Sequence, residues 1–308
     1  MSAHEWSGVF PAATTQYKAD MSVDIEATKA VVDNLIRDGI HGVIAMGTVG
    51  ENNSLKADEK RDILKAIVDT VAGRIPVITG VSELTTDLAA SYAKDAETIG
   101  ADGLMLLPAM VYVPSEAELE MHIRTVAAAS NLSIMLYNNP PAYRVSISLE
   151  TLQRLSDVRS LIAIKESAPD PRRITDIINA CGDRYLVFAG LDDVALEELV
   201  LGACGWVSGL TNAFPKESIA LWDAFKCGDM DEALAIYRWF MPLLHLDAEH
   251  DLVQSIKLAE QVMGRGSERV RMPRMVLEGA RRAEVIKMVE TARDNRPVLR
   301  ELASAEQG

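Results

Sequence analysis

The chain has 308 residues, of which 48% are apolar and 25% charged, and this composition excludes a disordered protein. Its formal net charge of -14 argues against nucleic-acid binding, because nucleic-acid binders ordinarily carry a basic surplus that neutralises phosphates. The length accommodates either two medium domains or one α/β barrel with an appendage.

The sequence also argues against a disulfide-stapled or membrane-anchored protein. Cys181, Cys204 and Cys227 form no CxxC pair, so neither a disulfide framework nor a zinc site is expected. The first residues lack a basic segment followed by an apolar one, and no apolar run approaches the ~20 residues that a spanning helix needs. We therefore expect a soluble, cytoplasmic protein.

Short apolar runs alternate with longer amphipathic stretches through most of the chain. The runs are apolar throughout, which predicts parallel strands buried on both faces. The predicted strands are Gly8–Thr14, Val43–Met46, Ile75–Val81, Gly103–Leu107, Ser133–Tyr137, Leu161–Ile164, Tyr185–Ala189 and Gly205–Leu210. The helices predicted to follow them are Asp24–Arg37, Asp58–Val71, Thr86–Ile99, Ser115–Ala129, Leu149–Leu155, Pro171–Asn179, Asp193–Leu201 and Pro215–Phe225.

Repeated strand–helix units of this kind predict an α/β fold, and their number favours a closed (β/α)8 TIM barrel. A doubly wound open sheet is the competing fold, but it usually carries a glycine-rich phosphate loop after its first strand, and Pro11–Thr15 contains none. We expect a catalytic barrel over residues 1–227 and a helical extension over 228–308. The three helices predicted in this extension are Asp229–Leu244, Glu249–Met263 and Arg281–Arg293.

The functional side chains of a barrel gather at the carboxyl ends of its strands, and Lys165 stands out there. It closes the apolar run Leu161–Ile164, where a lysine either points into the barrel mouth or caps the strand in a salt bridge. Burial beside an apolar wall lowers the pKa of an amine and makes it nucleophilic toward carbonyls. Lys165 is therefore a candidate nucleophile.

Tyr137 lies one strand–helix unit earlier than Lys165 and at the same expected height in the barrel. A phenol beside an amine can move protons while a carbinolamine forms and collapses. The alternative interpretation is that Tyr137 only packs at the rim.

The segment Gly47–Glu51 forms a tight turn after the second strand. We expect its glycines to adopt positive φ, so that successive N–H groups converge on an anion, with the Thr48 hydroxyl as a further donor. Gly47, Thr48 and Val49 are thus predicted to hold a substrate carboxylate, although a plain strand-to-helix turn is the alternative. Glu51 is expected to brace its own loop.

Four further strand-end residues are candidate substrate contacts only because of their position. They are Asn139, Gly190, Asp192 and Ser208. No metal or cofactor is expected, since a Schiff base formed by Lys165 would itself be the electron sink.

Three motifs together identify a family. They are Gly47–Glu51, Tyr137-Asn138-Asn139-Pro140 and Ile164-Lys165-Glu166-Ser167. With them the chain resembles, over nearly its whole length, the N-acetylneuraminate lyase / dihydrodipicolinate synthase family of class I aldolase-like lyases. The resemblance implies a Schiff base between Lys165 and a 2-keto acid, proton relay by Tyr137, carboxylate binding at Thr48 and Val49, and a homotetramer.

The chain departs from the members that condense pyruvate with aspartate semialdehyde. Such members usually have two adjacent hydroxyl residues in the turn, where this chain has Val49 second. They carry an arginine at the position of Ala142, whereas Arg144 lies two residues later. They also use a tyrosine from a neighbouring subunit after the fourth strand, and Tyr112 is displaced from that position.

The segments Gly47–Ser54 and Tyr137–Tyr143 are most similar to those of the 1-pyrroline-4-hydroxy-2-carboxylate deaminases of hydroxyproline degradation. The resemblance implies dehydration and deamination to 2,5-dioxopentanoate and ammonia. A 2-keto-3-deoxy sugar-acid dehydratase or aldolase is the alternative, and a dihydrodipicolinate synthase-like condensing enzyme is the second. A barrel that binds a keto acid without turnover is the non-enzyme alternative.

Overall fold

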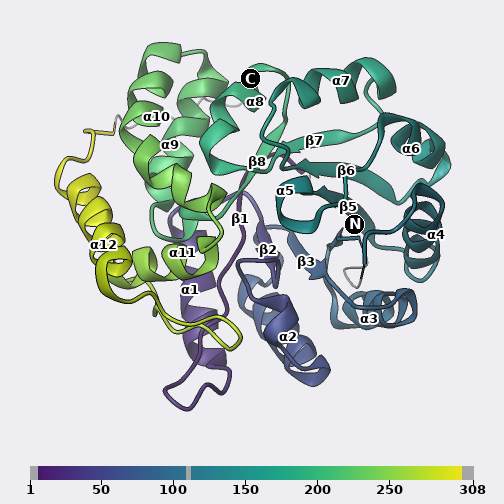
Figure 1. Ribbon diagram of the computed structural model, residues 1–308, viewed down its shortest axis with the longest axis horizontal. Coiled ribbons are helices and arrows are strands. Elements are labelled where there is room, and N and C mark those ends of the chain that lie inside the picture. The colour runs from purple at the N-terminus through teal and green to yellow at the C-terminus, as the bar shows by residue number, and fades with distance from the viewer. Residues whose placement is uncertain (1–5, 109–111, 300–308) are drawn as a thin grey trace.

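The computed structural model describes residues 6–108 and 112–299. It contains eight parallel strands that alternate with helices around a ring, as Figure 1 shows. The strands are β1 (Gly8–Pro11), β2 (Val43–Ala45), β3 (Val77–Val81), β4 (Gly103–Leu106), β5 (Ser133–Asn138), β6 (Leu161–Glu166), β7 (Leu186–Ala189) and β8 (Gly205–Ser208). The prediction of a (β/α)8 TIM barrel is confirmed.

The strands pair in the order β1-β8-β7-β6-β5-β4-β3-β2, so the ring nearly closes where β1 meets β2. An isolated parallel bridge between Ala12 and Ile44 joins these two edges, and the Ala13 N–H donates to the Ile44 carbonyl at 2.9 Å. The seam between β1 and β2 therefore lies directly below the Gly47–Glu51 turn that follows β2.

The barrel helices agree with the predicted ones to within a few residues. They are α1 (Ile25–Arg37), α2 (Ala57–Val71), α3 (Thr86–Ile99), α4 (Glu116–Ala127), α6 (Leu149–Arg154), α7 (Arg172–Cys181), α8 (Ala195–Val200) and α9 (Pro215–Cys227). The N-caps of α1, α3 and α4 are Asp24, Thr85 and Ser115, whose side chains accept backbone N–H groups of the first turn. One short helix, α5 (Pro140–Tyr143), was not predicted, because two prolines and four residues leave no periodicity to detect.

In the part of the chain that the structure describes, three helices follow the barrel: α10 (Met230–Leu244), α11 (Leu252–Val262) and α12 (Gly279–Asp294). They gather on one flank of the barrel beside α9 (Figure 1). Within the described residues, no helix combines the length and the apolar character that a membrane crossing requires.

Alternation along β5 and β6 decides which side chains reach the barrel interior. Met135, Tyr137 and Ala163 join an interior apolar cluster, whereas their neighbours Leu136 and Ile164 join the cluster between strands and helices. Lys165 is two residues beyond Ala163 and therefore points into the barrel, as does Tyr137.

Candidate active site

Lys165 and Tyr137 are register partners at the carboxyl ends of β6 and β5. The Lys165 ammonium nitrogen lies 4.2 Å from the centroid of the Tyr137 ring, and both side chains are buried, with relative exposures of 6% and 4%. Desolvation lowers the pKa of Lys165 from its ordinary value, an effect that nearby acidic groups, Asp247 first, partly oppose. The site thus holds an amine biased toward its neutral, nucleophilic form.

Asn139 fixes the orientation of the Tyr137 phenol. Its amide Nδ2 donates to Tyr137 Oη at 2.8 Å, while its Oδ1 caps α5 by accepting the Ala142 N–H at 3.0 Å. Burial raises the pKa of Tyr137 to about 12, although the hydrogen bond from Asn139 lowers it in part. Because the phenol accepts from Asn139, its own proton remains available to a partner in the cavity.

The Gly47–Glu51 turn differs from the expectation in where its strain lies. Positive φ occurs at Met46 (50°) and Glu51 (56°), not at the two glycines. Glycine is required at position 50 because there is no room for a side chain. A Cβ there would lie 2.8 Å from Met46 Cα and 2.9 Å from the Ala13 carbonyl oxygen. Left-handed conformation at two non-glycine residues is costly, and such strain clusters at functional sites.

The same turn presents donors toward the interior. Within the described residues, no acceptor takes up the backbone N–H groups of Thr48 and Val49. The Thr48 hydroxyl is hydrogen-bonded to the Tyr143 phenol, whose ring packs edge-on against Tyr137 with 5.7 Å between centroids. Sequence analysis did not assign Tyr143, because its contact depends on the unpredicted helix α5.

Glu51 holds its loop through partners that lie outside the loop. Its Oε1 accepts from Lys257 Nζ at 2.8 Å, and its Oε2 accepts the Arg271 N–H at 2.9 Å. Lys257 also donates to the Thr15 carbonyl at 2.8 Å, and the Lys257 and Glu51 side chains are fully buried. The C-terminal extension therefore holds the turn in place.

Lys165 lines an inner cavity, and a second, outer cavity shares several of its lining residues. The inner one, of about 30 Å³, is lined by Lys165 together with Ala12, Thr48, Val49, Met105, Tyr137, Asn139, Ala142, Gly190, Leu191, Gly209, Asp247 and Leu252. The outer one, of about 500 Å³, shares Thr48, Asn139 and Asp247 and adds Tyr143, His250 and Arg274 among its lining residues. The inner cavity accommodates little beyond a reacting end, so a longer ligand bonded to Lys165 must extend into the outer cavity.

The predicted site residues divide into two groups. Lys165, Tyr137, Thr48, Val49, Asn139 and Gly190 all line the inner cavity. Gly47, Asp192 and Ser208 are not among its lining residues. Asp192 is fully buried and accepts from Trp206 Nε1 at 2.9 Å and from the Leu210 N–H at 2.8 Å, while Ser208 Oγ accepts the Thr211 N–H at 3.1 Å. These two side chains brace the end of β8.

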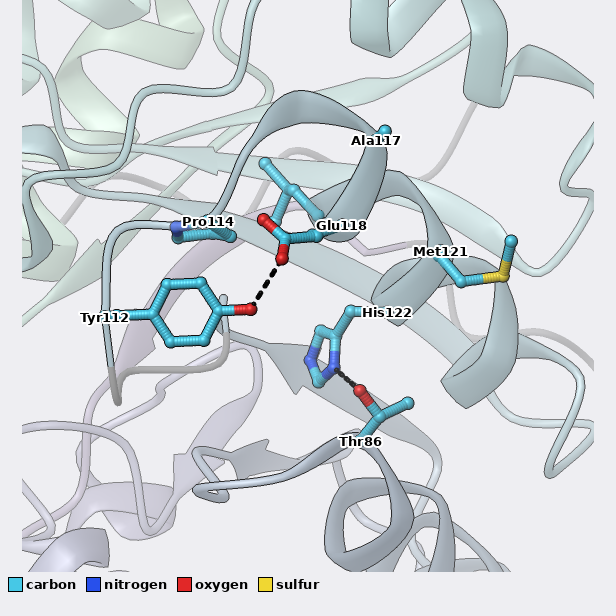
Figure 2. A pocket seen from close by; sticks show the side chains of 8 residues that line it. Thr86, Tyr112, Pro114, Ala117, Glu118, Met121 and His122 are labelled. Atoms are coloured by element: carbon cyan, nitrogen blue, oxygen red, sulfur yellow. Dashed lines mark hydrogen bonds between the residues drawn. The ribbon is translucent and has the colours of Figure 1, made fainter.

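Tyr112 is not part of this cavity. It is 60% exposed and donates to Glu118 at 2.8 Å in a separate surface pocket of about 400 Å³, where His122 contacts Thr86 (Figure 2). The positions 109–111 that precede it in the motif lie outside the described residues. Arg144 is exposed and lines neither cavity, whereas Ala142 lines both.

Comparison with known proteins shows which family the chain matches. The model of the dihydrodipicolinate synthetase family matches residues 5–292. The 4-hydroxy-tetrahydrodipicolinate synthase of Geotalea uraniireducens is 32% identical over 288 residues, which is 92% of this chain and 98% of the relative. The enzyme of the same name from Methanococcus maripaludis is 32% identical over 267 residues, covering 86% and 91% of the two chains.

Two solved structures with related descriptions superpose on this chain. A putative dihydrodipicolinate synthetase from Pseudomonas aeruginosa superposes with a TM-score of 0.88 at 30% identity, covering 93% of this chain and 99% of that one. YagE, a prophage protein of Escherichia coli described as belonging to the dihydrodipicolinic acid synthase family and solved in complex with pyruvate, gives 0.89 at 27% identity, covering 94% and 99%.

Proposed function

The chain belongs to the dihydrodipicolinate synthetase family of class I aldolase-type enzymes, and we propose that it is a Schiff-base lyase in which Lys165 attacks C2 of a 2-keto acid or cyclic imine. The observation that supports this most strongly is the register pairing of Lys165 with Tyr137 in the barrel interior. A desolvated amine beside a phenol provides both the nucleophile and a proton carrier.

We assign the carboxylate of the substrate to the Gly47–Val49 turn. This turn offers three donors: the N–H groups of Thr48 and Val49 and the Thr48 hydroxyl. Such donors can bind an anion locally even though the chain as a whole has a net charge of -14. Tyr137 then carries protons to and from the carbinolamine, and Asn139 acts on it by holding the phenol. Gly190 lines the inner cavity, and a Cβ there would collide with the Glu166 carbonyl oxygen and Ser167 Oγ, while Asp192 and Ser208 support the loops around the site.

We further propose the specific reaction of a 1-pyrroline-4-hydroxy-2-carboxylate deaminase. In this reaction Lys165 opens the cyclic imine at C2 and forms an enamine between C2 and C3. The enamine expels the C4 hydroxyl as water, and hydrolysis then releases ammonia and 2,5-dioxopentanoate. Val49 and Ala142 support this assignment, because neither supplies the side-chain hydroxyl or the guanidinium expected of a condensing member.

Two alternatives remain testable. A 2-keto-3-deoxy sugar-acid dehydratase or aldolase would use the same enamine. A condensing enzyme is favoured by the names of the relatives and by Arg274, a cation in the lining of the outer cavity where a second carboxylate would extend. We also propose a cytoplasmic homotetramer, on the resemblance alone.

A substrate panel distinguishes these reactions. The purified enzyme is given the 4-hydroxy cyclic imine, a 2-keto-3-deoxy sugar acid, or pyruvate with aspartate semialdehyde. We expect stoichiometric ammonia release from the cyclic imine to have the highest kcat/KM. Faster turnover of the sugar acid or of the condensation pair would overturn the deaminase assignment while leaving the Schiff-base chemistry intact.

Tyr137→Phe tests the proton carrier. We expect kcat to fall by about 10²–10⁴ because the variant keeps the ring and loses the phenolic proton. Tyr92→Phe is the matched control, since Tyr92 is also buried but bonds Thr79 in a different part of the barrel, at 2.8 Å. Unchanged kcat in Tyr137→Phe, measured under saturating substrate, would exclude the phenol from catalysis.

A further inference from the structure

A carboxyl group from the C-terminal extension faces Lys165 across the inner cavity. Asp247 lies in the short 3-10 helix His245–Ala248 that follows α10, and it is 9% exposed. Asp247 and Lys165 both line the inner cavity, yet no ion pair within 4.0 Å joins them in the described chain. The two side chains therefore share one cavity without being paired to each other.

The surroundings of Asp247 leave its carboxyl group available. Among the described residues, it accepts one hydrogen bond, a long one of 3.4 Å from the Asp192 N–H. Gly209 permits this position, because a Cβ there would collide with Asp247 Oδ1. Asp192 differs sharply, since its two oxygens are occupied by Trp206 Nε1 and by the N–H groups of Gly209 and Leu210. Asp247 is thus the carboxyl group of this pair that can turn to a ligand.

We propose that Asp247 is the general acid that protonates the hydroxyl group leaving from C4 of a substrate bonded to Lys165, an inference that rests on the proposed function. The nitrogen lone pair of the enamine re-forms the C2=N bond, and the C2=C3 pair moves to C3=C4. The C4–O bond breaks with its electrons on oxygen, and the Asp247 proton completes a molecule of water. Asp247 is left as a carboxylate.

The position of Asp247 also allows its proton to be replaced. It lines the outer cavity as well as the inner one, and that outer cavity reaches the surface at the exposed residues Pro141 and Ala142. Tyr137 is less suited to this step, since burial raises its pKa to about 12. Burial raises the pKa of Asp247 from its ordinary value, and Lys165 opposes this in part, so the acid form persists to higher pH than in water.

The charged and titratable groups that face Asp247 come from several elements. They are Lys165 on β6, Tyr137 on β5, Tyr143 on α5, Asp192 and Asp193 after β7, and Glu249, His250 and Arg274 around the outer cavity. Among the charges that act on Asp247, Lys165 has the largest effect, whereas burial first and the charge of Asp247 second raise the pKa of Asp192. The pH response therefore belongs to this group of side chains, and the Asp247 variant is needed to assign it.

Asp247→Asn tests the proposal, with Asp102→Asn as the matched control. Asp102 accepts the Val77 N–H at 2.8 Å, lines neither cavity and is not among the groups that face Asp247. Turnover of the 4-hydroxy substrate is expected to fall about 10²–10⁴-fold in Asp247→Asn and to be unchanged in Asp102→Asn. The wild-type rate should fall as pH rises through the pKa of Asp247, and this descending limb should be absent from the residual activity of Asp247→Asn.

Two further measurements distinguish a general-acid role of Asp247 from a purely structural one. Borohydride reduction with pyruvate should label Lys165 in Asp247→Asn as fully as in the wild type, which shows that the site is folded. A substrate analogue with fluorine in place of the C4 hydroxyl should be turned over almost equally by both proteins, because fluoride leaves without being protonated. Full turnover of the hydroxy substrate by Asp247→Asn, or equal loss with both leaving groups, would overturn the proposal. Absence of labelling in the wild type would instead overturn the proposed function.

Discussion

Lys165→Ala is expected to abolish the covalent adduct with pyruvate and to lower turnover by at least about 10⁴-fold, as the loss of a nucleophile does in other covalent enzymes. Lys165 is the only amine among the described residues that line the inner cavity, so no neighbour can replace it there. Intact-mass measurement after borohydride reduction, followed by peptide mapping, places the adduct. We expect one adduct per wild-type chain and none in the variant.

Lys60→Arg is the control for this experiment. Lys60 is also buried, with 5% exposure, but its ammonium group pairs with Glu83 at 2.5 Å on a different part of the barrel. The arginine variant keeps that charge and should retain both the adduct and turnover. An adduct on Lys165→Ala, or full turnover by it, would refute Schiff-base catalysis at this residue.

Lys257→Met is expected to cost about 3–5 kcal/mol of the free energy of unfolding, because it leaves the fully buried Glu51 carboxylate without its cation. The Thr15 carbonyl loses its 2.8 Å donor in the same step. Urea unfolding followed by circular dichroism measures the loss. The variant should also bind pyruvate more weakly, since Glu51 belongs to the turn that carries Thr48 and Val49.

The double variant Glu51→Gln/Lys257→Met removes both charges and should recover part of the loss. Lys65→Met is the surface control. Lys65 pairs with Asp69 at 3.0 Å on the exposed face of α2, where such pairs contribute about 0.3–0.5 kcal/mol. If Lys257→Met were no more destabilising than Lys65→Met, the buried pair would not hold the turn.

Residues whose positions follow from local pattern could be predicted from the sequence. A lysine that closes an apolar strand is recognisable because parallel barrel strands are apolar on both faces, and Tyr137 follows from the same register. Both lie in the inner cavity as expected. The helix ends were also close to prediction, because Asp24, Thr85 and Ser115 are caps that act within one turn.

Residues whose positions depend on distant packing could not be predicted. Glu51 is paired across the chain with Lys257, and no local rule connects the two. Asp247 lines the same cavity as Lys165 only because the extension folds over the carboxyl ends of the strands. The turn also shows that glycine need not mark positive φ, since Gly50 serves a close approach while Met46 and Glu51 carry the strained backbone.

The long-range pairing of Glu51 with Lys257 has a consequence for synthesis on the ribosome. The partners are 206 residues apart, so at translation rates of about 5–20 residues per second Glu51 waits about 10–40 s before its cation is made. During that time this carboxylate lacks the ammonium group that it pairs with in the folded chain. The turn that we propose for the substrate carboxylate therefore gains this support last, although its own residues are among the first to be translated.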